Sequence, residues 1–271
     1  MKLKLKWKII FGIVLFIIFI FVMMKVNTLG LKENEYNVVN SKLSSFYGFK
    51  IIHFSDLYYG KKINEKKLNK LVNMINESKP DIVIFTGDLV HNKFTVSEDI
   101  SKTISNSLSK INSTYGKFYV KGDLDDSVSE SILSNSNFKL LDDSYEILYS
   151  KDNKTMFIGG ININHELSKD MVETLNLNNY DYKILLSHYP DKIDNVLKYN
   201  FDLVLSGHSL NGQFRLPGIN GVIHFKNANK YVEPYYKIEN TDFYISNGIG
   251  SKINLRLFNT PSFNLYRLVD K

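Results

Sequence analysis

Five side chains that can bind a metal follow predicted strands along this chain. They are carboxylates and imidazoles that come just after apolar runs: Asp56, Asp88, Asp123, His188 and His208. The clearest run is Ile82 to Phe85, which is rich in β-branched residues and leads into Thr86-Gly87-Asp88. A run without alternation predicts a strand covered on both faces. Because open α/β sheets bind ligands at the carboxyl ends of their strands, we expect these side chains to converge.

Carboxylate oxygens together with imidazole nitrogens suit zinc, manganese or iron. A single Asp after a strand is usually a turn residue or a helix cap, and a single His beside a strand is usually a satisfied core residue. Five such residues at equivalent places instead predict a metal centre. Of the other histidines, His91 is near Asp88 and is a candidate to line the centre, whereas His53 lies inside a predicted strand and His224 in a predicted hairpin.

The order of the predicted elements indicates one α/β domain without internal repeats. A helix whose apolar face includes Leu68, Leu71, Val72 and Ile75 lies between two predicted strands, which implies a right-handed crossover and a parallel pair. Further helices are predicted near 97–113, 127–135 and 191–198. Strands are predicted at 49–54, 82–85, 117–121, 138–141, 155–159, 182–186, 203–205, 222–225, 243–246 and 263–268.

The N-terminus predicts a membrane anchor. Ile9 to Met24 carries no charge and, with Trp7, Lys8 and Lys25 at its ends, is long enough to cross a bilayer. Lysines crowd the first residues, so the positive-inside rule places the N-terminus in the cytoplasm and the domain outside the cell membrane. The alternative is a cleaved signal peptide, although no small-x-small site follows the apolar run. The predicted organisation is an anchor over 1–25, a polar tether over 26–46 and a domain over 47–271.

Composition supports a globular domain and excludes some functions. The chain has 271 residues, of which 44% are hydrophobic and 23% charged. Five of the six net positive charges come from the lysines at positions 2, 4, 6, 8 and 25, so the remainder is close to neutral. We therefore expect no nucleic-acid partner. The absence of cysteine excludes disulfides and thiolate metal sites.

Five segments resemble, in order, the motif blocks of the calcineurin-like metallophosphoesterases: FSDLYYG, FTGDLV, VKGDLDD, LLSHYPD and LSGHSLNGQ. The resemblance is strongest to the membrane-anchored bacterial branch, similar to the UDP-2,3-diacylglucosamine pyrophosphatase relatives. The tail YISNGIGSKINLRLF also resembles that branch. The resemblance implies a four-layer α/β/β/α sandwich after one transmembrane helix. It also implies a two-metal centre that hydrolyses phosphoesters or pyrophosphates, with lipid-linked substrates at the membrane face as one class.

Four positions depart from the pattern that this resemblance implies. Tyr58 replaces the histidine of the first block, and Leu210 replaces the second histidine of the last block. In the third block, Asp123 replaces an amide ligand and Leu124 replaces the catalytic histidine, so no catalytic residue is assigned.

The departures fall mainly on one of the two family metals. That metal is held by Asp56, Asp88 and the positions of Tyr58 and Leu210. Leucine cannot bind a metal, and tyrosine would have to ionise to bind well. The other metal is held by residues that can all still bind: Asp88, Asp123, His188 and His208. The sequence therefore predicts one divalent ion rather than two.

Two classes of function stay open. One ion with three ionised carboxylates carries a charge of about −1, which disfavours a phosphate ester. Four protein ligands also complete a tetrahedral zinc shell, and the loss of a general acid at Leu124 costs about 10²–10⁴-fold. The protein is therefore either a hydrolase with weak or lost activity, or an inactive pseudo-phosphoesterase that serves as a binding or scaffold protein.

Overall fold

The computed structural model describes residues 2–164, 167–216 and 218–271, with side chains described from residue 5 onward. Two six-stranded sheets form the centre of the domain. In sheet order, the first contains β1 (Lys32–Val39), β12 (Ser262–Val269), β2 (Lys50–Phe54), β3 (Ile82–Phe85), β4 (Gly116–Tyr119) and β5 (Lys139–Leu140). The second contains β10 (Tyr235–Ile238), β11 (Thr241–Ile245), β9 (Leu203–Ser206), β8 (Tyr182–Ser187), β7 (Thr155–Gly160) and β6 (Ser144–Tyr149).

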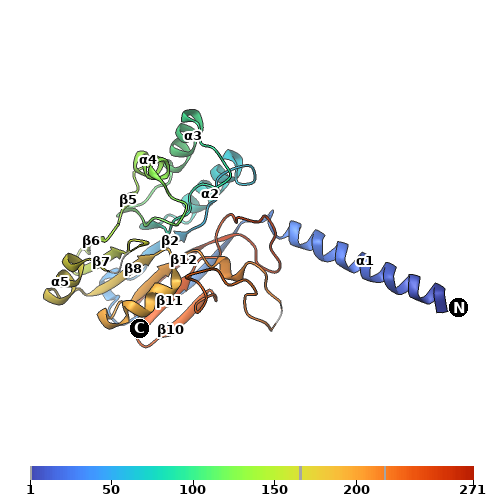
Figure 1. Cartoon of the computed structure of the whole chain (residues 1–271). Coiled ribbons are helices and arrows are strands. Elements are labelled where there is room, and N and C mark those ends of the chain that lie inside the picture. Colours follow the sequence, from blue (N-terminus) through green and yellow to red (C-terminus); the bar gives the residue numbers. More distant parts are fainter. Residues whose placement is uncertain (1, 165–166, 217) are drawn as a thin grey trace.

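Helices cover the outer face of each sheet, so the predicted four-layer α/β/β/α architecture is confirmed (Figure 1). The first sheet is covered by α2 (Glu65–Glu77), α3 (Glu98–Leu108) and α4 (Ser127–Asn135). The second is covered by α5 (Lys169–Leu177) and two 3₁₀ helices, Pro190–Asn195 and Leu197–Tyr199.

The apolar runs of the sequence are strands buried on both faces. In β2, Ile51 packs between the two sheets, whereas the next residue, Ile52, packs under the helices. The apolar stripe of α2 is buried on the same side, and the Asn64 side chain caps this helix by accepting a hydrogen bond from the Lys67 N–H. β2, β3 and β4 pair in parallel, as do β7, β8, β9 and β11. Their carboxyl ends therefore share one edge in each sheet.

The predicted tether over 26–46 is wrong for most of its length. Lys32–Val39 is strand β1, which pairs in parallel with β12 at the edge of the first sheet. Val38, Leu43 and Phe46 are buried against the core. The sequence of β1 is largely polar because an edge strand buries few of its side chains, and so it resembles a tether.

Other differences lie at the sheet periphery. Residues 222–225 form a loop with a single bridge between Phe225 and Ala228, where we predicted a strand. The predicted helix at 191–198 is two short 3₁₀ helices. β6, β10 and α5 were not predicted, since their side chains are only partly covered and give a weak periodic signal.

The N-terminal helix α1 (Lys2–Val26) extends from the domain as a separate rod (Figure 1). Its segment Leu5–Val26 has a mean hydropathy of 3.0, and none of its side chains is buried. By length and composition this helix can span a membrane.

Candidate metal centre

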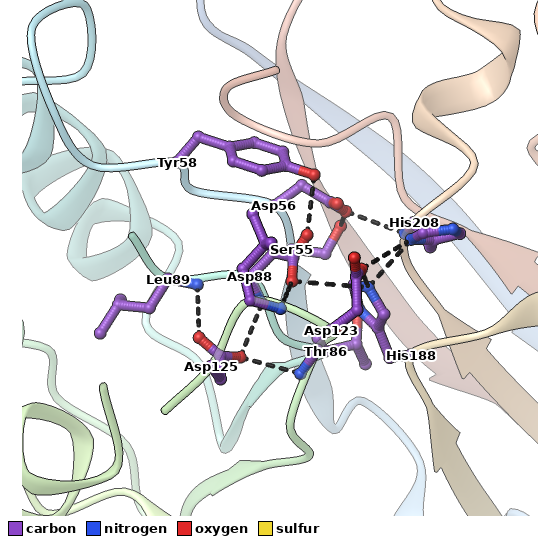
Figure 2. Close-up of polar contacts among 12 residues, drawn as sticks. Ser55, Asp56, Tyr58, Thr86, Asp88, Leu89, Asp123, Asp125, His188 and His208 are labelled. Carbon is purple, nitrogen blue, oxygen red and sulfur yellow. Dashed lines mark hydrogen bonds and ion pairs between the residues drawn. The ribbon is translucent and has the colours of Figure 1, made fainter. Parts of the chain in front are cut away.

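Four of the five predicted ligands form one cluster at the carboxyl ends of β3, β4, β8 and β9 (Figure 2). One ligand atom from each of Asp88, Asp123, His188 and His208 lies within 4.8 Å of the others. His188 Nε2 lies 3.4 Å from Asp123 Oδ1 and 3.7 Å from Asp88 Oδ1, and His208 Nδ1 lies 3.3 Å from Asp123 Oδ1. The cluster presents two oxygen and two nitrogen ligands to one point.

Both imidazoles are oriented so that one ring nitrogen faces this point. His188 Nδ1 lies 2.6 Å from the Thr86 carbonyl oxygen, and His208 Nε2 lies 2.9 Å from the Lys226 carbonyl oxygen. A carbonyl oxygen can only accept a hydrogen bond, so these ring nitrogens carry the protons. His188 Nε2 and His208 Nδ1, which lie 3.1 Å apart, are left free to bind. Backbone partners of this kind fix ligand histidines in metal sites, so the residues fit a divalent ion.

Asp56 lies beside this cluster but does not belong to it. Its Oδ2 accepts hydrogen bonds from the Ser55 hydroxyl at 2.5 Å and from the His208 backbone N–H at 3.0 Å. Its Oδ1 is buried and has no hydrogen-bond partner. Asp56 is thus held close to the centre by the two loops that follow β2 and β9.

Tyr58 occupies the space beside Asp56 where the family resemblance implies another ligand. Its hydroxyl donates a hydrogen bond of 2.7 Å to Asp88 Oδ2. Burial raises the pKa of this phenol strongly, and the negative charges of Asp56 and Asp88 raise it further. The phenol therefore stays protonated and acts as a hydrogen-bond donor to Asp88 rather than as a metal ligand.

The two leucines at family histidine positions have different surroundings. Leu210 is buried against the backbone of Gly248, where an added Cβ would lie 2.5 Å from Leu210 Cδ2. Leu124 is half-buried, and its backbone N–H donates to Asp88 Oδ1 at 3.0 Å. The backbone at Leu124 thus contributes to the centre although its side chain cannot.

Close backbone approach makes the glycines here necessary. A Cβ on Gly122 would lie 2.3 Å from Asp88 Oδ1 and 2.5 Å from Asp88 N. Asp88 and His208 themselves adopt left-handed backbone conformations, with φ of 63° and 64°. Non-glycine residues adopt this region at a cost and are frequent at functional sites.

Two charged residues of the centre, Asp125 and Lys252, were not predicted from the sequence. The Asp125 carboxylate accepts backbone N–H bonds from Gly122, Asp88 and Leu89, at 2.7–2.8 Å (Figure 2). Lys252 Nζ lies 3.2 Å from Asp123 Oδ2. Asp125 lies in the VKGDLDD segment, only two residues from Asp123, so the sequence contained a signal for its role. Lys252 comes from a loop that is distant in sequence, and no local pattern indicates its contact with Asp123.

Arg256 also lies near the centre, and its side chain is fully buried. Its guanidinium donates to the carbonyl oxygens of Asn247, Gly248 and Gly250. Burial lowers the pKa of Arg256 to about 10, against the opposing effect of Asp56, so the group stays charged at neutral pH. It supports the loop that closes over Asp56 and places a positive charge near it.

Of the remaining histidines, His165 lies outside the described residues, and the other three lie outside the cluster. His91 Nε2 lies 3.2 Å from the Lys252 carbonyl oxygen, and its ring packs against Tyr58 at 6.0 Å, so it borders the centre. His53 is buried between Thr86 and Tyr266. His224 is partly exposed and lies 2.9 Å from the Asn229 carbonyl oxygen.

The metal-free cluster should release a proton when it binds a divalent ion. Burial lowers the pKa of His188, but the carboxylates of Asp88 and Asp123 outweigh it and raise the pKa to about 10. His188 is therefore protonated at pH 7, and Nε2 must lose its proton before it binds a metal. Affinity for zinc should rise up to about tenfold per pH unit between pH 6.5 and 10. Titration calorimetry in buffers of different ionisation enthalpy measures the released proton. A binding enthalpy that is the same in every buffer would contradict the release of a proton.

Comparison with known proteins agrees with this geometry. A family model described as calcineurin-like phosphoesterase matches residues 49–212, which include all five predicted ligands. The metallophosphoesterase YkuE of Bacillus subtilis is 28% identical over 246 residues, covering 88% of this chain and 85% of YkuE. The UDP-2,3-diacylglucosamine pyrophosphatase LpxG of Chlamydia muridarum is 24% identical, covering 83% of this chain and 85% of LpxG. The phosphodiesterase YaeI of Escherichia coli is 23% identical, covering 82% of each chain. The chain belongs to the calcineurin-like phosphoesterases.

Proposed function

We propose that this protein is a membrane-anchored phosphoesterase with its domain outside the cytoplasm, that it binds one divalent ion, and that it hydrolyses phosphoesters or pyrophosphates weakly. The ion binds to Asp88, Asp123, His188 and His208. The family is metal-dependent, and the cluster has the ligand types and the oriented imidazoles that zinc, manganese or iron requires.

The hydrogen bond from Tyr58 to Asp88 is the observation that carries the single-ion proposal. A bridging carboxylate in a two-metal centre must offer one oxygen to each ion. Here Asp88 Oδ2 accepts the hydrogen bond from the Tyr58 hydroxyl, while Oδ1 faces His188. Of the four residues that the family resemblance assigns to the second ion, Asp56 and Asp88 can supply ligands, whereas the Tyr58 phenol stays protonated and Leu210 cannot bind a metal. Two carboxylates without imidazoles are a poor site for a second zinc.

The electrostatics support phosphate binding better than the ligand set alone predicts. The expected charge of about −1 leaves out Asp125, Lys252 and Arg256, and with all three included the centre with one ion is about neutral. Lys252 is half-exposed at the opening of the centre, where it can contact an anionic group. A neutral centre repels a phosphate ester less than a centre of charge −1 would, so the weakness of catalysis rests mainly on the missing ion and on Leu124.

The residues of the chain have distinct roles in such a reaction. A bound divalent ion would polarise a phosphoryl oxygen and lower the pKa of water. Lys252 attracts the anionic group, and the Leu124 N–H together with Tyr58 holds Asp88 in place. The Leu124 side chain cannot donate a proton to a leaving group, which accounts for a loss of about 10²–10⁴-fold in rate.

The alternative function is a non-catalytic relative that keeps one structural ion and serves as a binding or scaffold protein. Its support is the leucine at each of two histidine positions, 124 and 210. An assay with an aryl phosphate and an aryl phosphodiester in manganese separates the two functions. Turnover that is lost in Asp88→Ala supports the weak hydrolase, whereas no turnover by a metal-loaded, folded protein supports the scaffold.

The substrate class is proposed from the position of the domain. LpxG is a pyrophosphatase of a diacylated sugar nucleotide by name. A domain held at a bilayer by α1 has lipid-linked substrates within reach. We therefore propose a lipid-linked phosphoester or pyrophosphate as the natural substrate.

The proposed topology predicts that protease added to intact cells digests the domain and leaves a cytoplasmic marker protein intact. The reason is that lysines at positions 2, 4, 6 and 8 precede the apolar span and hold the N-terminus inside. If the domain is protected from protease in intact cells, the orientation is the opposite of the one proposed. A mature N-terminus after about residue 25 would instead show a cleaved signal peptide.

A further inference from the structure

We infer that the face of the domain around the end of α1 docks on the anionic surface of the bilayer that α1 crosses. This inference rests on the membrane anchor proposed above. Beyond the anchor, the inference gives the orientation of the domain relative to the bilayer, and it gives a lipid partner for a pocket beside the metal centre.

The contacts of α1 fix the level of this face relative to the bilayer. The Arg256 backbone N–H donates to the Met24 carbonyl oxygen at 3.1 Å, and Lys25 Nζ donates to the Asn254 carbonyl oxygen at 3.4 Å. Met24 lies inside the apolar span, which ends at Val26. Two residues correspond to about 3 Å along a helix. The chain at 254–256 therefore lies at the level of the lipid head groups.

Large apolar side chains are exposed at this level. Ile253 is 56% exposed and Phe258 is 54% exposed, and they flank the residues that contact α1. Leu29, just after α1, is 69% exposed. Single exposed apolar residues are common on soluble surfaces, but apolar side chains grouped at a membrane interface insert among the lipids.

A basic pocket opens between this face and the metal centre. It has a volume of about 330 Å³, and its lining includes Thr28, just after α1, and Tyr58 of the centre. Five of its lining residues are lysine or arginine, and none is acidic: Lys61, Lys62, Lys93, Lys252 and Arg256. Lys61, Lys62 and Lys93 are exposed and form no ion pair with any described residue. Unpaired cations beside exposed apolar groups match an anionic lipid surface.

The position of the pocket gives this surface a role at the centre. Lys252 lines the pocket and also contacts Asp123. A lipid phosphate that enters the pocket from the bilayer would therefore contact cationic side chains along its whole path, from the level of the lipid head groups to the metal ligand Asp123. This favours a lipid over a soluble anion as the occupant, because the exposed apolar residues Leu29 and Ile253, which are sequence neighbours of the lining residues Thr28, Lys252 and Asn254, would otherwise stay exposed to water.

The docking can be measured on the full chain, because the protein contains no cysteine. Single variants Ile253→Cys, Leu177→Cys and Phe16→Cys would each carry a nitroxide label in nanodiscs, and collision with oxygen or with a water-soluble nickel complex reports depth. Leu177 is 75% exposed on α5, which lies far from α1 (Figure 1). In nanodiscs that contain phosphatidylglycerol, we expect the Ile253 label to lie in lipid and the Leu177 label in water.

Charge removal tests the role of the lysines. Lys61→Gln, Lys62→Gln and Lys93→Gln together should lower the ratio of docked to undocked protein about a hundredfold, at about fivefold per lysine. The matched control removes three exposed lysines elsewhere, Lys151, Lys169 and Lys198, and should leave the Ile253 label in lipid.

The three labels separate the possible failures. An Ile253 label in water while the Phe16 label lies in lipid overturns the docking and leaves the anchor intact. A Phe16 label in water overturns the anchor and the docking together. An Ile253 label that is equally deep in pure phosphatidylcholine and in the triple lysine variant overturns the anionic-lipid partner.

Discussion

Restoring the replaced family groups should give a centre that binds two ions and hydrolyses an aryl phosphate measurably. The variant combines Tyr58→His, Leu210→His, Leu124→His and Asp123→Asn. The first two changes return imidazoles beside Asp56, and the Tyr58 change also frees Asp88 Oδ2 to bridge. The third returns a proton donor at a half-buried position that lines a surface pocket. Manganese-dependent turnover and the number of bound ions are the measurements.

Single changes should do little, since two ions must act on the same phosphoryl group and the effects are therefore not additive. Leu210 is the position at risk, because its side chain packs closely against Gly248. Thermal unfolding of each variant must accompany the assay. Robust turnover by the unchanged protein, lost in Asp88→Ala, would show a working enzyme and refute the proposed weakness. A folded variant with two ions and no turnover would place the defect in substrate binding.

The Gly122→Ala variant should lose most of its metal affinity. The added Cβ would lie 2.3 Å from Asp88 Oδ1, so the Asp88 carboxylate or the backbone must move. We expect a cost of about 1–3 kcal/mol in folding free energy from overpacking. Zinc affinity should fall by about 100-fold or more. Mutating a residue that only supports a metal ligand already costs about 10–100-fold in affinity, and here the ligand Asp88 itself is displaced. Calorimetric titration and chemical denaturation measure both effects.

Gly48→Ala is the matched control for this variant. Gly48 has a φ of 80°, and a Cβ there would contact no atom within 4 Å. The substitution should destabilise the fold by about 1–2 kcal/mol through backbone strain and leave metal affinity unchanged. Equal zinc affinity in the Gly122→Ala variant and in the parent would show that Asp88 is not a ligand.

The sequence predicted which side chains gather at the strand ends because of how parallel sheets are built. Strands such as β3 are buried on both faces and appear as short continuous apolar runs, so their ends can be located to within a few residues. Asp88, Asp123, His188 and His208 follow such ends, and parallel pairing brings the ends to one edge. The helices α2 and α4 were also predicted, because each has a buried stripe and a capping residue before it.

The parts that were missed depend on tertiary contacts or on partial burial. β1 is a polar edge strand whose partner, β12, lies at the other end of the chain. Lys252 and Arg256 act at the centre only because the loop after β11 returns to the strand ends. The hydrogen bond of Tyr58 to Asp88 could not be predicted from residue types, although the replacement of a histidine by Tyr58 was evident.

The number of ions per chain is the measurement that tests the central proposal most directly. Elemental analysis of protein purified from metal-replete cells should give one divalent ion per chain. The His208→Ala variant should lose it. His224→Ala should keep it, because the exposed His224 ring lies against the Asn229 carbonyl and outside the cluster. Two tightly bound ions in the unchanged protein would contradict the role given to Tyr58. An ion that persists in His208→Ala, or no ion at all, would contradict the site itself.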